Sequence, residues 1–404
     1  MSNDHLSRTL WIAAAAALAS SAGACKWTEF DDLAQTTWVH STSKPGVNST
    51  DYGLELRQVQ HAGDGAKLAV IGSNEPSFST LVYDTKGNTT LGPAPVDLNK
   101  EFTINSIPDA PALVADPSSD NVAFVIPSTE NRTVVLSGAA DALVELTIND
   151  PKPSSAVYLP GPSGTASTLL VSGTGNFHGI AGSTANTCVA ADDLAAPLQA
   201  IVMAPLGANV LVWNDQGKLL QYDAATVVAS NDGPSAVAVS PIGAAIDLGF
   251  KPGARSKLIP LGGTLVLVVG IAPLIGGDGM AGVYDLATGM PAGSPAVQPA
   301  TYQGLRSAAF GTVLGTPYLA LGFPTRPVQN IAAGQVEVHE VDIVGGSVSD
   351  SIDLALSDDQ PENNQSFGQA IEIMHFNDDD IFVVAADNEI FSYYETTKYP
   401  DARK

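Results

Sequence analysis

Cysteine and basic residues are scarce in this chain of 404 residues. It contains 2 cysteines, too few for a disulfide-bonded scaffold or for a zinc site built from several thiolates. Lysine and arginine number 18 against 42 aspartates and glutamates, so the formal net charge is −24. A nucleic-acid-binding protein needs a positive face that displaces counterions from phosphates. We therefore expect no nucleic-acid partner.

Long apolar segments and amphipathic helices are scarce as well. Beyond the N-terminal region the most apolar stretch, residues 261–275, contains three glycines and Pro273, whereas a membrane-spanning helix needs about 20 apolar residues in succession. No long segment repeats an apolar face with the period of a helix. The hydrophobic content of 45% still excludes a disordered chain. The sequence therefore predicts an all-β globular protein.

Recognisable catalytic motifs are missing. The sequence has no Gly-x-Ser-x-Gly elbow, no His-Glu-x-x-His pair and no phosphate-binding glycine loop. His178 lies in a glycine-rich turn, Gly175-Asn-Phe-His-Gly179, where we expect a surface or hydrogen-bonded turn histidine rather than one that approaches a pore or a ligand. Trp213 ends an apolar run and is expected in the core rather than in a sugar-binding platform. No catalytic residue is predicted.

Residues 1–24 have the layout of a secretory signal peptide. A polar start containing Arg8 leads into an apolar run, residues 10–19, which small residues follow. The run is shorter than the roughly 20 residues of a membrane-spanning helix. We therefore predict an exported protein whose mature chain begins at Cys25.

Cys25 has two interpretations, which compete for one sulfur atom. Ala22-Gly-Ala-Cys25 resembles the bacterial lipobox, in which the cysteine is acylated, although Ala22 stands where Leu, Val or Ile is usual. The same residues suit ordinary signal cleavage, after which Cys25 pairs with Cys188 in an oxidising compartment. We favour the lipoprotein. Lys26 is then the second residue of the mature chain, where an Asp would retain a lipoprotein at the inner membrane of a Gram-negative bacterium. Because Lys stands there, we predict the outer membrane. A periplasmic or secreted soluble protein is the alternative.

Short apolar runs bounded by Gly, Asn, Asp or Pro recur along the mature chain. Successive starts lie 54, 47, 41, 55, 53 and 63 residues apart. Runs that are apolar throughout are typical of strands covered on both faces, and this spacing is typical of a β-propeller. The seven runs are Leu68–Gly72, Val122–Ile126, Leu169–Gly173, Val210–Trp213, Leu265–Gly270, Tyr318–Gly322 and Ile381–Ala385.

We therefore predict a β-propeller over residues 51–398, with seven blades as the first choice and six or eight as alternatives. A polar tether, residues 25–50, precedes it and a short tail, residues 399–404, follows it. Two tandem β-sandwiches are the competing architecture. Strands of a sandwich with one solvent-exposed face would alternate apolar and polar residues. The seven runs do not alternate in this way.

Three motifs near the C-terminus point to one type of propeller. Phe367-Gly368 opens an alternating strand, Leu321-Gly-Phe-Pro324 ends an apolar strand, and Gly334-Gln-Val-Glu-Val-His339 forms a closing strand. They resemble the FG-GAP repeats of integrin-α-type propellers. Residues 52–84 and 261–286 fit this repeat more loosely, and the clear resemblance covers about a third of the chain.

The resemblance implies calcium sites, because an Asp-rich loop precedes the apolar strand in that family. Hard cations favour several oxygen ligands in a tight loop. The corresponding loop of the last repeat offers Asp378 and Asp380, and the first repeat offers Asp64. We favour solvated turn carboxylates for all three, with calcium ligands as the alternative.

The function predicted from these features is a binding or scaffolding module at the cell envelope, with a protein or glycan ligand on one face of the propeller. Attachment to the membrane would depend on the N-terminal lipid. A propeller enzyme, such as a hydrolase, a lyase or a quinone-dependent oxidoreductase, is the alternative, because propeller active sites are assembled from scattered residues.

Overall fold

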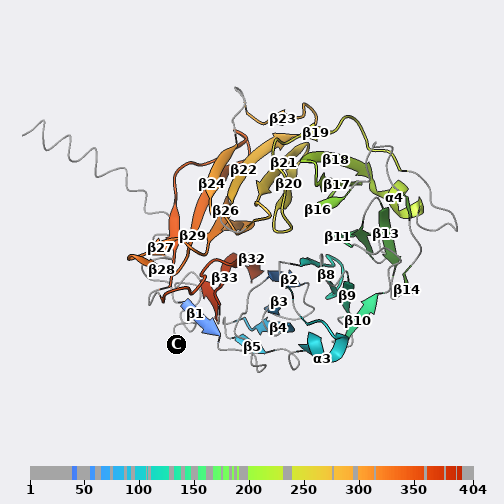
Figure 1. The fold of residues 1–404 in the computed structure, drawn as a ribbon. Helices are drawn as coiled ribbons and strands as arrows, with labels where there is room; N and C mark the ends of the chain where they lie inside the picture. The colour runs from blue at the N-terminus through green and yellow to red at the C-terminus, as the bar shows by residue number, and fades with distance from the viewer. Residues whose placement is uncertain are drawn as a thin grey trace, which may run out of the picture.

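A computed structural model shows seven β-sheets arranged as a ring around one axis (Figure 1). It describes residues 39–42, 55–59, 65–72, 76–85, 89–91, 96–105, 107, 111–126, 132–137, 142–146, 153–160, 167–173, 176–181, 184–185, 189–190, 199–230, 239–274, 277–293, 299–313, 315–358, 362–376, 379–387 and 389–393. Within these residues each sheet has four or five antiparallel strands, and we number the sheets as blades one to seven in chain order.

In the first six blades the chain runs from the innermost strand outward. Blades one to three comprise β2 (Glu55–Val59), β3 (Ala66–Gly72), β4 (Ser77–Tyr83), β5 (Thr89–Leu91) and β6 (Val96–Asp97); β7 (Ala112–Ala115), β8 (Val122–Ile126), β9 (Arg132–Ser137) and β10 (Ala142–Leu146); and β11 (Ser155–Leu159), β12 (Thr168–Ser172), β13 (Asn176–Ala181), β14 (Thr184–Ala185) and β15 (Val189–Ala190).

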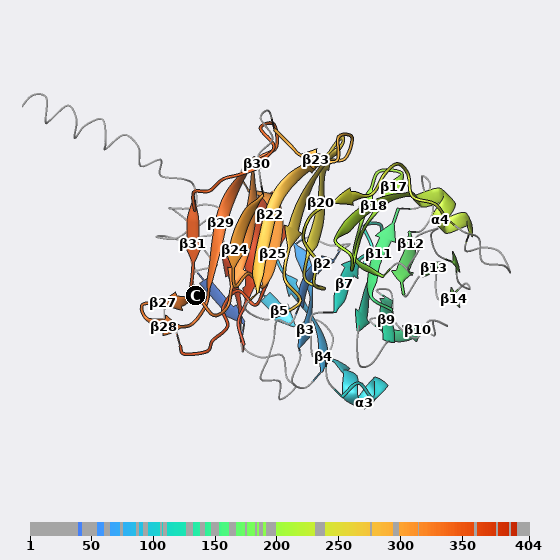
Figure 2. The same cartoon turned by 45° about the horizontal axis from the view of Figure 1, so that its top comes forward.

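Blades four to six repeat the arrangement. They comprise β16 (Ala200–Leu206), β17 (Asn209–Asn214), β18 (Lys218–Asp223) and β19 (Ile246–Asp247); β20 (Lys257–Gly262), β21 (Leu265–Gly270), β22 (Asp278–Asp285), β23 (Met290–Pro291) and β24 (Ala300–Gln303); and β25 (Ser307–Val313), β26 (Thr316–Phe323), β29 (Gln335–Asp342), β30 (Ser347–Val348) and β31 (Leu354–Leu356). A separate hairpin of β27 (Pro327–Val328) and β28 (Ile331–Ala332) extends from blade six (Figure 2).

Blade seven closes the ring. Its strands β32 (Ala370–Phe376), β33 (Asp379–Ala385) and β34 (Ile390–Tyr393) come from the end of the chain, and its outer strand, β1 (Val39–Thr42), comes from the beginning. β1 pairs antiparallel with β34, with Val39 opposite Tyr393 and Thr42 opposite Ile390. Part of the predicted tether, residues 25–50, is therefore a strand of the propeller.

The seven apolar runs form the second strand of each blade, β3, β8, β12, β17, β21, β26 and β33. These strands are covered by a neighbouring blade on each face. All five residues of β8 and all seven of β3, for example, are buried. The prediction of a β-propeller from uninterrupted apolar strands is confirmed, and the tandem sandwich is excluded.

The hydrophobic core is divided among the junctions between blades. Seven clusters of buried side chains occur in the described residues, and each joins two neighbouring blades around the ring. The cluster that closes the ring packs Leu68 and Tyr83 of blade one against Phe376 and Val383 of blade seven. Because one sheet cannot bury both of its faces alone, each blade depends on its two neighbours.

The junction of blades six and seven needs glycine. A Cβ atom on Gly322 would overlap the carbonyl oxygen of Gly368 and the hydroxyl of Ser307. Gly368 itself has a φ angle of 88°, a region that side chains other than glycine rarely adopt. Both glycines belong to the motifs that resemble FG-GAP repeats, and here they let the two blades approach closely.

Helix is a minor component of the described residues. α3 (Leu98–Phe102) begins at Asp97, whose side chain accepts a hydrogen bond from the backbone of Lys100. α4 (Ala224–Ser230) follows β18. In the part of the chain that the structure describes, no helix has the length and apolar character that crossing a membrane requires.

Candidate functional site: the central channel

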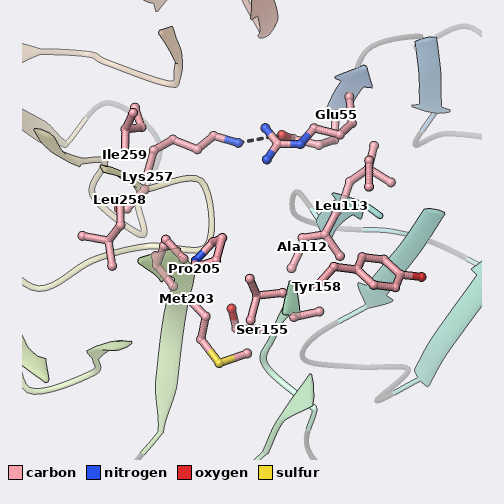
Figure 3. Close-up of a pocket in the computed structure, with 18 of the residues that line it drawn as sticks. Glu55, Ala112, Leu113, Ser155, Tyr158, Met203, Pro205, Lys257, Leu258 and Ile259 are labelled. Carbon is pink, nitrogen blue, oxygen red and sulfur yellow. Dashed lines mark hydrogen bonds and ion pairs between the residues drawn. The ribbon is translucent and has the colours of Figure 1, made fainter. Parts of the chain in front are cut away.

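The innermost strands of all seven blades surround a central cavity of about 370 Å³. β2, β7, β11, β16, β20, β25 and β32 each contribute residues to its wall. Figure 3 shows the cavity from close by, with Lys257 and Glu55 on one side and Met203, Pro205 and Ser155 on the other. Its volume lies at the lower end of the roughly 300–1,000 Å³ that small-molecule sites occupy.

The wall of the cavity is charged on one side and apolar on the other. Glu55 and Arg57 of β2, Lys257 of β20 and Glu372 of β32 supply the charged groups. The opposite side is formed by Ala112 and Val114 of β7 and by Ile201 and Pro205 of β16, all of which are at least partly exposed. A ligand in this cavity would therefore meet two different chemical environments.

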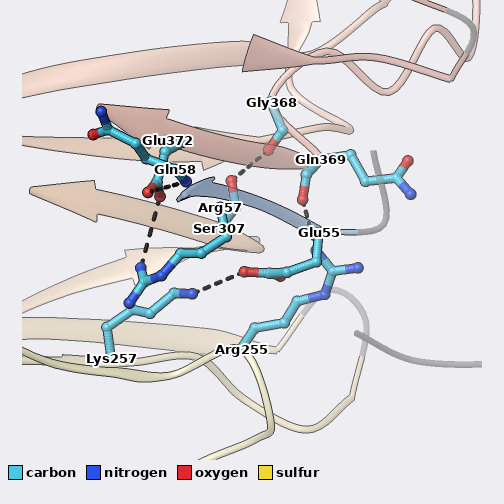
Figure 4. A network of polar contacts seen from close by, with 9 residues as sticks. All are labelled: Glu55, Arg57, Gln58, Arg255, Lys257, Ser307, Gly368, Gln369 and Glu372. Carbon is cyan, nitrogen blue, oxygen red and sulfur yellow. Dashed lines mark hydrogen bonds and ion pairs between the residues drawn. The ribbon is translucent and has the colours of Figure 1, made fainter. Parts of the chain in front are cut away.

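An ion pair crosses the channel. Lys257 Nζ donates a hydrogen bond to Glu55 Oε1 at 2.9 Å, and the two side chains are 27% and 9% exposed. Lys257 belongs to blade five and Glu55 to blade one, so blades six and seven lie between them in the ring. Figure 4 shows the Lys257 side chain extended toward Glu55. The pair thus links two blades that are not neighbours.

A second ion pair lies beside the first. Arg57 Nη1 is 3.7 Å from Glu372 Oε2, and the backbone N–H of Gln58 donates to Glu372 Oε1 at 2.9 Å. Burial raises the pKa of Glu372 above its ordinary value, and the charge of Arg57 and the Gln58 hydrogen bond oppose this shift. The carboxylate is therefore held at a desolvation cost that its partners offset only in part.

Gln58 connects the open edges of β2 and β32. Its Nε2 donates to the carbonyl oxygen of His375 at 2.7 Å, and its Oε1 accepts from the backbone N–H of His375 at 2.8 Å. Unpaired N–H and C=O groups on an edge strand invite other chains to pair with it. The side-chain amide of Gln58 satisfies one such N–H and C=O pair and joins blade one to blade seven.

Two further side chains bind to the chain just before β32. Arg255 Nη1 donates to the carbonyl oxygen of Gln369 at 2.7 Å, and Ser307 Oγ donates to that of Gly368 at 2.6 Å. Arg255 is 3% exposed. The contacts drawn in Figure 4 therefore join blades five, six, seven and one into one network around the channel.

Of the predicted calcium ligands, only Asp380 lies within the described residues. Asp64 and Asp378 lie outside them, as do Cys25, the predicted lipidation site, and Cys188, its alternative disulfide partner. Asp380, at the start of β33, accepts a hydrogen bond from the backbone N–H of Thr312 at 2.8 Å, and its other oxygen is 2.9 Å from His375 Nδ1. Asp380 thereby links blades six and seven.

No group of three or more His, Cys, Asp or Glu side chains that could hold a metal ion occurs among the described residues. His178 is buried at 3% exposure within β13, opposite Val171 of β12, so it is a strand residue and not the expected turn histidine. Trp213 is fully buried between blades four and five, where its ring centroid lies 6.1 Å from that of Phe250. The prediction that Trp213 belongs to the core is confirmed.

Sequence reasoning did not identify the charged residues of the channel. In β2, Glu55 and Arg57 share a face with Val59, and Leu56 lies on the other face, so this strand has neither an uninterrupted apolar run nor a regular alternation. Lys257 and Glu372 stand 202 and 317 positions away from Glu55 in the chain (257 − 55 and 372 − 55). Only the closed ring brings these four residues together.

Known structures support the architecture. BBS1N, in its crystal structure in complex with ARL6DN, matches with a TM-score of 0.53 and 12% sequence identity over 88% of this chain and 96% of that chain. The WD40 β-propeller domain of Doa1 matches with a TM-score of 0.52 and 13% identity over 90% of this chain and 99% of that chain. This chain is a seven-bladed β-propeller. At these identities the likeness establishes the fold alone.

Sequence comparisons add no family. No protein-family model matches the chain, and the search of curated proteins gave no significant match. The function must therefore be argued from the fold and the channel.

Proposed function

We propose that this propeller is a binding or scaffolding module at the cell envelope, which presents a protein ligand with a rigid face. The observation that carries the proposal is the network around the channel. It ties blades five, six, seven and one together by contacts between groups of opposite charge and by hydrogen bonds to backbone. Such a ring holds its surface loops in fixed positions, which is what a recognition surface needs.

The pairing of charges in the channel favours binding over catalysis. Glu55 is held by Lys257, and Glu372 is held by Arg57 and by the backbone of Gln58. A catalytic acid or base must be able to exchange a proton with a substrate. These carboxylates instead hold the blades together.

Propellers of similar fold support a protein ligand by analogy. BBS1N was crystallised in complex with ARL6DN, and another structure with a TM-score of 0.50 and 8% identity, over 88% of this chain and 93% of that chain, is that of the mitotic checkpoint complex. We transfer from them only the class of partner, a protein. The resemblance to FG-GAP repeats is part of the same proposal. The glycines of these motifs lie at the close junction of blades six and seven.

The cell-envelope location rests on the N-terminal sequence. Residues 1–24 have the layout of a signal peptide, and Cys25 follows in a lipobox-like context. Two signals are needed for stable membrane attachment by acyl chains, and a multiply acylated N-terminal cysteine would supply them. A surface of net charge −24 would add no attraction to anionic lipids.

Fractionation of a Gram-negative host that expresses the full chain tests this proposal. We expect the wild-type protein in the membrane fraction, with an intact mass raised by several acyl chains. The Cys25→Ala variant should be soluble in the periplasm. Cytoplasmic location of both proteins, or identical fractionation of the two, would contradict the envelope assignment.

The binding role is tested with the soluble Cys25→Ala variant. Cross-linking in intact cells, followed by size-exclusion chromatography with light scattering, should show a complex of fixed stoichiometry with an envelope protein. A propeller that remains monomeric under these conditions would contradict a scaffolding role.

A further inference from the structure

The cavity in the channel has more hydrogen-bond donors than acceptors. A lysine ammonium carries three N–H donors and an arginine guanidinium carries five. Among the described residues, the hydrogen bond of Lys257 goes to Glu55, and Arg57 makes an ion pair with Glu372 at 3.7 Å. Several donors of both cations therefore remain for a ligand that brings acceptor oxygens.

The cations are also the more accessible members of the two pairs. The side chains of Arg57 and Lys257 are 40% and 27% exposed, whereas those of Glu372 and Glu55 are 13% and 9% exposed. A ligand that enters the cavity meets the ammonium and guanidinium groups before it meets the carboxylates. This order favours a negatively charged ligand group.

The other side of the cavity requires an apolar ligand body. Ala112, Val114, Ile201 and Pro205 have apolar side chains that are at least partly exposed, and their contact with a ligand would remove apolar surface from water at about 25 cal/mol per Å². A small inorganic anion would leave this wall uncovered. An amphipathic molecule would satisfy both sides at once.

We propose that the channel binds a compact carboxylate with an apolar body. Its carboxylate lies against Lys257 and Arg57 and competes with Glu55 for Lys257, and its body lies against the apolar wall. A single negative charge fits better than a phosphate, because Glu55 and Glu372 stay close by and would repel a dianion more strongly. This small-molecule site lies inside the ring and is independent of the proposed protein ligand on its face.

Three probes of equal length test the charge of the ligand. Octanoate, octylamine and octanol are titrated into the purified Cys25→Ala protein at neutral pH by isothermal titration calorimetry. We expect octanoate to bind with one-to-one stoichiometry and at least tenfold more tightly than either of the others. Tighter binding of octylamine, equal binding of octanol, or no binding of octanoate would overturn the proposal.

Two substitutions in the channel give opposite expected effects. Lys257→Met removes the charge, keeps most of the apolar stem, and should weaken octanoate binding at least tenfold. Glu55→Gln removes the competing carboxylate and should tighten octanoate binding several-fold. Lys218→Met is the matched control, because Lys218 forms an exposed ion pair with Asp247 on β18 and β19, away from the cavity.

The pair of channel variants protects the test against a folding defect. If Lys257→Met fails to fold, as circular dichroism would show, the sign of the Glu55→Gln effect still decides. Tighter binding of octanoate by Glu55→Gln supports the site. Weaker or unchanged binding by this variant overturns it.

Discussion

The two sides of the ring hold their blades together by different means. Around blades five, seven and one, the links are long charged or amide side chains, such as Lys257, Glu55 and Gln58, which reach across or along the channel. Around blades two, three and four, the contacts seen in the described residues include short hydroxyls. Ser154 Oγ donates to the carbonyl oxygen of Ala200 at 2.7 Å, and the hydroxyls of Ser118 and Ser167 are 2.9 Å apart.

This difference coincides with the closure of the ring. Blades one and seven are built from opposite ends of the chain, and their association closes the longest loop in the molecule, at the highest entropic cost. The Tyr83 hydroxyl, 3.1 Å from Ser392 Oγ, and the pairing of β1 with β34 add contacts at the same junction. The long charged and amide links therefore lie beside the junction that closes the ring.

The largest effect is expected from breaking the pair that crosses the channel. Lys257→Met leaves the Glu55 carboxylate, 9% exposed, without its partner, and should lower the free energy of unfolding by about 3 kcal/mol. Urea unfolding measures this loss. Lys218→Met, in an exposed pair, should cost less than about 1 kcal/mol, and equal losses for the two variants would contradict the comparison.

A smaller loss is expected from the amide that bridges blades one and seven. Gln58→Ala removes two hydrogen bonds to the backbone of His375 and should cost about 1–2 kcal/mol in urea unfolding. The exposed Gln216, whose side-chain amide contacts Asp215, serves as the matched control. Its replacement by alanine should leave stability almost unchanged.

The hydroxyl links on the other side should matter least. Ser154 Oγ contacts the carbonyl oxygens of both Ser172 and Ala200, so Ser154→Ala should cost about 1 kcal/mol. The exposed Ser351 provides the control substitution. A larger loss for Ser154→Ala than for Gln58→Ala would reverse the order of the two sides.

Stability should also depend on the ionisation of Glu372. Because burial raises its pKa in the folded protein, folding favours the protonated form, and the charged form costs stability that is relieved as pH falls through the raised value. Glu372→Gln lacks this cost. Thermal melting from pH 4 to pH 8 should therefore show the variant gaining stability relative to the wild type as pH rises. A constant difference would contradict the assignment.

The sequence predicts the repeated part of the fold well and the channel poorly. Runs such as Val122–Ile126 and Leu265–Gly270 are apolar at every position because blades cover both of their faces, and this requirement is visible locally. The outer strand Val39–Thr42 lacks such a pattern, and its place beside β34 follows from closure of the ring.

The channel residues escaped prediction for a physical reason. Their proximity depends on the positions of four innermost strands around a common axis, and no short-range spacing encodes it. The acidic loop that contains Asp380 predicts a metal ligand. In the structure Asp380 contacts Thr312 and His375, and calcium binding remains a prediction.

The most direct measurement of the central claim is a double-mutant cycle on Glu55 and Lys257. Urea unfolding of the wild type, Glu55→Gln, Lys257→Met and the double variant yields the coupling free energy between the two side chains. A pair that joins blades one and five across the channel predicts a coupling of about 1–3 kcal/mol. A coupling near zero would show that the two residues do not meet, and would contradict the closed network on which this account depends.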